Sequence, residues 1–82
     1  MSDLNPSDAM HKLDVTLWVG KHGVDAVADE LADQLTDREL VKVKFLRAAR
    51  ADGDVEALAT ELTEQGGGSV VETRGHTAVI RG

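Results

Sequence analysis

The sequence predicts a two-layer α/β sandwich, in which a four-stranded mixed sheet carries two long helices on one face. Residues 15–19 and 40–47 alternate in hydrophobicity with the period of two that is typical of half-buried strands. From Val24 and again from Val55, apolar residues recur three and four positions apart, as on one face of a helix. Two further strand patterns end the chain, so the predicted order is α-β-α-β-α-β-β, with a short helix first.

The chain of 82 residues is long enough for one domain, which we assign to residues 7–82 after a flexible tail at residues 1–6. Pro6-Ser7-Asp8 can open one or two helical turns that run through Leu13. The first residues lack the basic and apolar stretches of a secretory signal, and no apolar run approaches the ~18 residues of a membrane span. We therefore expect a cytoplasmic protein without membrane contacts.

The second helix and the final hairpin have clear boundary residues. Asp52-Gly53-Asp54 supplies a turn and a cap before the helix, and Gly66-Gly67-Gly68 ends it. The strand patterns at residues 69–73 and 77–81 are joined by Arg74-Gly75-His76, a connection short enough for a hairpin.

The turn Gly20-Lys21-His22-Gly23 lies between the first strand and the first long helix, which Asp25 can cap or favour in its first turn. Glycines let the backbone approach a ligand closely, and the first amides of a helix lie at its positive end. The backbone of residues 21–24 can therefore cradle a phosphate, with Lys21 adding charge and His22 bonding or stacking on a base or ribose. Alternatively, the turn is a tight connection that touches nothing, and His22 is an exposed loop residue.

Charge is unevenly distributed along the chain, which has 15 acidic and 9 basic residues and a formal net charge of −6. Acidic residues cover the predicted helices, while basic residues gather in the GxxG turn, the middle strand with its exit, and the last hairpin. The basic residues concerned are Lys21, Lys42, Lys44, Arg47, Arg50, Arg74 and Arg81. Lys42 and Lys44 either contact a ligand or only solvate the open face of the sheet, and the arginines extend the same basic track. The sequence thus predicts two separate charge surfaces.

Trp18 and Phe45 are the only aromatic residues. Trp18 is offset by one position from the apolar residues of its strand, so it faces away from the two helices. We expect the N-terminal segment to cover it, in preference to its serving as an exposed platform for base stacking.

Nothing in the sequence indicates catalysis, a metal or a small-molecule cofactor. The chain has no cysteine, and its three histidines, His11, His22 and His76, have no ligand-like spacing. No Ser/His/Asp arrangement has a sequence context, and no carboxylate pair stands out among the many scattered ones. We therefore expect a protein that is not an enzyme.

Three segments together resemble a known family: residues 17–24 as an apolar strand with its GxxG loop, residues 39–45 as Glu-Leu-Val-Lys-Val-Lys-Phe, and residues 74–82 as a hairpin with Gly, an aliphatic run and Arg. They resemble the CRM domain, the chloroplast RNA splicing and ribosome maturation module, in its YhbY-like single-domain prokaryotic form. The chain departs from the family's longer, more basic N-terminal helix, since only His11 and Lys12 are available there.

The resemblance implies a fold related to the C-terminal domain of translation initiation factor three, and RNA binding without catalysis in assembly of the large ribosomal subunit. The implied partner is ribosomal RNA or a pre-ribosomal particle, bound by a monomer. The implied RNA contacts are Gly20, Lys21, His22, Gly23, Lys42, Lys44, Arg47, Arg50, Arg74 and Arg81.

Two further expectations follow from the acidic helix surfaces. One is an alternative function, in which the chain is an acidic module that docks through its helices on a basic ribosomal or RNA-processing protein, with a purely structural GxxG turn. The other is an origin in a salt-loving organism, because few lysines, abundant aspartate and small aliphatic core residues suit concentrated salt.

Overall fold

The computed structural model describes residues 12–51 and 53–82. Within them the chain forms, in order, β1 (Val15–Val19), the 3₁₀ helix η1 (Val24–Val27), α2 (Ala28–Asp37), β2 (Leu40–Phe45), α3 (Arg47–Arg50), α4 (Val55–Gly66), β3 (Ser69–Arg74) and β4 (Thr77–Arg81). The strands form one mixed sheet in the order β1-β2-β4-β3, with β1 and β2 parallel and the other neighbours antiparallel. The predicted fold class is confirmed.

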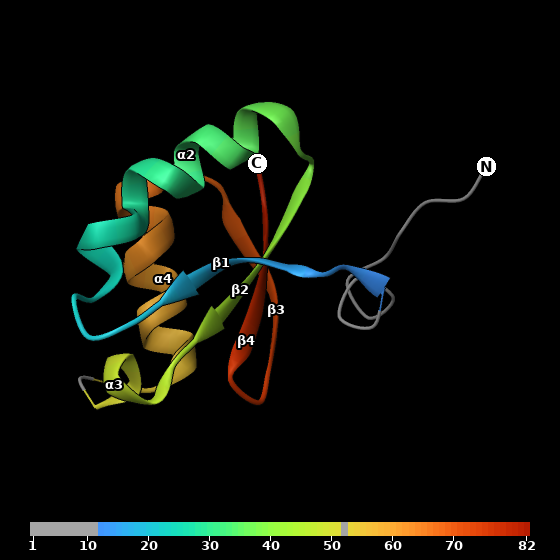
Figure 1. The fold of residues 1–82 in the computed structure, drawn as a ribbon. Helices are drawn as coiled ribbons and strands as arrows, with labels where there is room; N and C mark the ends of the chain where they lie inside the picture. The colour runs from blue at the N-terminus through green and yellow to red at the C-terminus, as the bar shows by residue number, and fades with distance from the viewer. Residues whose placement is uncertain (1–11, 52) are drawn as a thin grey trace.

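The main core lies between the sheet and the two long helices, α2 and α4, which cover the same face (Figure 1). Alternate strand residues such as Leu17 and Val43 are fully buried there against Leu31 of α2 and Leu62 of α4. The period of two in the strands and the three-to-four spacing in the helices place these side chains on facing surfaces.

The opposite face of the sheet is left open by α2 and α4 and carries the polar strand residues, including Lys42 and Lys44. A small second cluster forms there around the buried Val79, with Leu13, Leu40 and Val71 packed against it. The open face is therefore polar and basic on one part and apolar on another.

One contact ties the edge strand β1 to α2. The Thr16 hydroxyl lies 2.6 Å from Gln34 Oε1 and donates to it, and Gln34 Nε2 donates to the Thr16 carbonyl at 2.8 Å. The strand is irregular at this point, because its register with β2 shifts between Val15 and Leu17.

The boundaries of the second helix and the hairpin agree with the sequence. Asp54 is the N-cap of α4 and accepts a hydrogen bond from the Ala57 amide at 2.8 Å. Gly67, with φ of 96°, follows the last helical residue, and the two hairpin strands are joined at Gly75-His76.

Two elements differ from the prediction. The first long helix begins as the 3₁₀ turn η1, in which the Ala26 amide donates to the Gly23 carbonyl three residues back at 3.3 Å. The strand expected over residues 40–47 ends at Phe45, because the Leu46 carbonyl accepts hydrogen bonds from the amides of Ala49 and Arg50 and starts α3. The predicted tail at residues 1–6, and most of the predicted leading helix, lie outside the described residues.

In the part of the chain that the structure describes, no helix combines the length and the apolar character that a membrane span needs.

Candidate nucleic-acid interface

The GxxG segment forms a closed turn between β1 and η1. The Gly23 amide donates to the Gly20 carbonyl at 3.0 Å, which leaves Lys21 and His22 exposed at the corner. The Gly23 amide is thus used inside the turn. Of the four backbone positions expected to cradle a phosphate, residues 21, 22 and 24 keep amides that this bond does not occupy.

The backbone conformation requires glycine at only one of the two glycine positions of the turn. Gly23 has φ of 81° and ψ of −177°, a conformation that is essentially restricted to glycine. Gly20 has no positive φ, and a Cβ there would lie 3.9 Å from Leu46 Cδ1, an ordinary van der Waals distance. The fold therefore requires glycine at position 23 and does not require it at position 20.

The start of η1 has no side-chain cap. Asp25 lies in the first turn, where its charge favours the helix, but its Oδ1 accepts from Gln65 Nε2 of α4 at 2.5 Å and caps nothing. A surface hollow of about 330 Å³ borders this start, and its lining includes Lys21 and His22 of the turn together with Asp25 and Glu61. The hollow is therefore lined by both basic and acidic residues.

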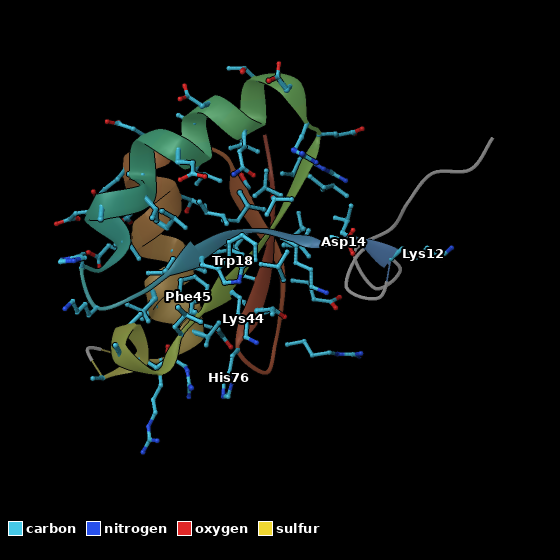
Figure 2. The ribbon with its side chains drawn as sticks, in the orientation of Figure 1. Lys12, Asp14, Trp18, Lys44, Phe45 and His76 are labelled. Carbon is cyan, nitrogen blue, oxygen red and sulfur yellow. The ribbon has the colours of Figure 1, made fainter. Side chains whose placement is uncertain are left out.

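Strand register brings three separate loops to one end of the sheet. Trp18 of β1 pairs with Lys44 of β2, Lys44 pairs with Thr77 of β4, and Thr77 pairs with Arg74 of β3. Since β1 and β2 end where β4 begins, the GxxG turn, α3 and the hairpin turn all lie at this end, which we call the loop end. Figure 2 shows the side chains of Trp18, Lys44 and His76 toward this end of the sheet.

Most of the predicted basic residues meet at the loop end. Lys44 and Arg74 lie in the row just described and Lys21 lies in the turn, while α3 contributes Arg47 and Arg50. Arg47 is exposed, whereas Arg50 is half-buried and its Nε donates to the Phe45 carbonyl at 3.2 Å, which holds the guanidinium against the end of β2. Four chain segments therefore supply cations to one region.

Lys42 and Arg81 are not brought there. Lys42 lies two residues back along β2, and its Nζ donates to the Leu13 carbonyl at 3.4 Å. Arg81 pairs with Leu40 and Ser69, four residues along β4 from Thr77 and hence about 14 Å away. Lys42 therefore lies in the middle of the sheet and Arg81 at its opposite end.

Acidic residues border the loop end on its helix side. A second hollow, of about 440 Å³, is lined by Arg50 and His76 together with Asp54 and Glu56 at the start of α4. Acidic residues at the start of α4 thus lie beside Arg50 and His76 of the basic region. Among residues 12–51 and 53–82, no group of three or more His, Asp or Glu side chains is arranged to hold a metal ion.

Sequence reasoning missed three features of this region. Trp18 is 52% exposed, against the expectation that it would be covered, and the segment expected to cover it lies outside the described residues. Leu46 is 39% exposed beside the turn, and His76 is exposed at the hairpin turn, where its carbonyl accepts from the Phe45 amide at 2.8 Å. The pairing of β2 with β4, which no local pattern reveals, brings His76 to this end.

Comparisons with known proteins show the family and the fold that this chain resembles. The model of the CRS1/YhbY (CRM) domain family matches residues 7–80. A curated relative from Methanocaldococcus jannaschii, named as a probable RNA-binding protein, is 36% identical over 70 residues. That match covers 85% of this chain and 52% of the relative, so the chain spans about half the length of the curated relative.

A solved structure also matches the fold. It is the solution structure of a hypothetical protein from Staphylococcus aureus, described as a candidate RNA-binding protein. The TM-score is 0.72 at 28% sequence identity, and the match covers 93% of this chain and 78% of the other.

Proposed function

Because the chain belongs to the CRS1/YhbY (CRM) domain family, we propose that it is an RNA-binding protein that acts without catalysis. The observation that carries the proposal is the loop end, where the GxxG turn lies among cations from the turn, β2, α3 and β3. The names of the relatives from Methanocaldococcus jannaschii and Staphylococcus aureus agree with it.

In this proposal, the GxxG turn and the cations around it contact different phosphates of the RNA. The amides of residues 21, 22 and 24 and the charge of Lys21 hold phosphates at the turn, where backbone and helix start favour an anion. Lys44, Arg47, Arg50 and Arg74 neutralise phosphates of the same strand as it crosses the loop end. Lys42 and Arg81 lie farther along the open face and extend the contact to longer RNA.

Charge reversal at matched positions tests the interface. Lys21→Asp removes a cation from the loop end, and Arg38→Asp makes the same charge change at the C-terminal end of α2, near the start of β2. We expect Lys21→Asp to weaken binding of ribosomal RNA fragments, measured by fluorescence anisotropy, and to reduce the slope of log K against log salt by about one unit. Arg38→Asp should change the RNA affinity and the salt slope much less. Equal losses of RNA affinity in the two variants would refute the assigned interface.

We further propose that the RNA is ribosomal and that the protein, a cytoplasmic monomer, acts in assembly of the large ribosomal subunit. Support comes from the three sequence segments that resemble YhbY-like proteins. Crosslinking in cells followed by RNA sequencing tests the assignment, which requires large-subunit rRNA to be enriched over messenger RNA.

One observation favours a second function, docking on a basic protein through the helices. The outer face of α2 carries the exposed carboxylates of Asp29, Glu30, Asp33 and Asp37. If this function holds, a basic protein should be crosslinked to the chain in cells. Asp33→Lys should abolish that crosslink, while Lys21→Asp leaves it unchanged. The reverse result favours RNA binding at the loop end.

A further inference from the structure

Trp18 is the only tryptophan of the chain, and it is 52% exposed on the open face of the sheet. In the part of the chain that the structure describes, only Trp18 and Leu46 are large hydrophobic residues with exposed side chains. Both lie next to the GxxG turn: Trp18 precedes Gly20 by two residues, and the Leu46 amide donates to the Val19 carbonyl at 2.8 Å. The exposed apolar surface is therefore concentrated beside the turn.

Cations flank this apolar surface on the open face. Lys44 is the direct neighbour of Trp18 on β2, about 4.8 Å away between strands, and it is exposed. Arg74 ends the same row two strands farther on, and Lys21 follows Trp18 within the turn. The row Trp18, Lys44, Thr77 and Arg74 contains no carboxylate, although the chain has a net charge of −6.

An exposed indole beside cations fits one chemistry well. A base that is not in a duplex presents a π-face that stacks on an aromatic side chain, while its phosphates attract neighbouring lysine and arginine. Paired bases hide these faces inside the helix. A basic protein partner would instead meet repulsion from Lys44.

We propose that Trp18 stacks on an unpaired nucleotide of the bound RNA, next to the phosphate contacts of the GxxG turn. This inference rests on the proposed RNA binding and adds to it the kind of RNA: single-stranded, or paired with an unpaired end, loop or bulge. Because every base has a π-face, the stack itself gives little sequence preference.

The sole tryptophan supplies a direct test with the wild-type protein. A short oligouridylate and a blunt RNA duplex of the same length are each titrated into the protein, and the indole fluorescence is followed. We expect the oligouridylate to quench the fluorescence and the duplex to leave it nearly unchanged at equal saturation.

Variants then separate stacking from charge. Trp18→Thr keeps a residue that suits a strand but removes the ring, and Trp18→Phe keeps a ring as the matched control. With a fluorescein-labelled oligouridylate, Trp18→Thr should weaken binding about 5- to 100-fold, and Trp18→Phe should restore most of it. Binding of the blunt duplex should be equal in all three proteins.

The possible failures are distinguishable. Equal affinity of Trp18→Thr and wild type for the oligouridylate, with a loss in Lys21→Asp, overturns the stacking site and leaves RNA binding standing. Equal quenching by duplex and single strand also overturns it. If the wild-type protein binds neither RNA, the proposed function itself fails, and the stacking site with it.

Discussion

At the scale of single residues, the two glycines of the GxxG turn have different roles although the sequence shows them as one motif. Gly23 is needed by the backbone, because its φ of 81° and ψ of −177° are strained for any residue with a Cβ. Gly20 has an ordinary φ and space for a methyl group. The structural explanation of the motif therefore accounts for only one of its two glycines.

This difference predicts opposite effects of the same substitution. Gly23→Ala should lower the free energy of unfolding by about 1–3 kcal/mol, because alanine is strained in that conformation. Gly20→Ala should change it by less than about 1 kcal/mol, with a gain from reduced flexibility of the unfolded chain. Chemical denaturation of both variants measures the two values, and a similar loss in both would contradict the geometry described above.

At the scale of elements, the start of α4 depends on one side chain. The Asp54 carboxylate accepts from the Ala57 amide at 2.8 Å, whereas Gly23 offers η1 no such bond. A capped helix start has fewer unbonded amides to present to a ligand than an uncapped one. The Asp54 carboxylate thus bonds an amide at the start of α4, whereas no side chain caps the start of η1 beside the GxxG turn.

Removal of the Asp54 cap should lower the stability of the protein, and a chemically similar residue at this position should preserve that stability. Asp54→Ala should destabilise the protein by about 1 kcal/mol, and Asp54→Asn should remain close to wild type because its amide oxygen accepts the same bond. Thermal unfolding of the pair measures this. If both variants lose the same stability, the negative charge and not the hydrogen bond stabilises α4.

The long elements were predictable because their patterns extend over enough residues. Residues 40–45 alternate over three apolar positions, and α2 and α4 repeat their apolar spacing over several turns. The four residues of α3 are too few for any period, and they follow a strand pattern that continues into Leu46 and Arg47. The row from Trp18 to Arg74 was not predictable either, since it depends on β4 inserting between β2 and β3.

At the scale of the whole molecule, charge is segregated between the helices and the sheet. The exposed Asp29, Asp33 and Asp37 follow one another at intervals of four residues on α2, so like charges are neighbours along one line of the helix. Five of the nine basic residues lie at the loop end: Lys21, Lys44, Arg47, Arg50 and Arg74. Repulsion along α2 is the part of this distribution that salt relieves most directly.

Stability should therefore increase with salt. We expect the thermal midpoint to rise from dilute buffer to molar KCl, because screening shortens the range of repulsion to about 3 Å. Asp33→Asn removes the middle charge of the line and should flatten this rise, while Arg38→Gln should steepen it. A midpoint that is independent of KCl in the wild type would contradict the expectation.

The contact between Thr16 and Gln34 has a consequence for how copies of the molecule meet. β1 is an edge strand, and an edge with unpaired backbone groups is a template on which another chain can add a strand. Gln34 occupies the Thr16 carbonyl, and the register shift at this point interrupts the strand's regular hydrogen-bonding edge. Gln34→Ala should raise concentration-dependent self-association in sedimentation velocity, whereas Gln65→Ala on α4 should not. We therefore predict that the Gln34 side chain, by occupying this acceptor, limits the addition of a second copy at the β1 edge.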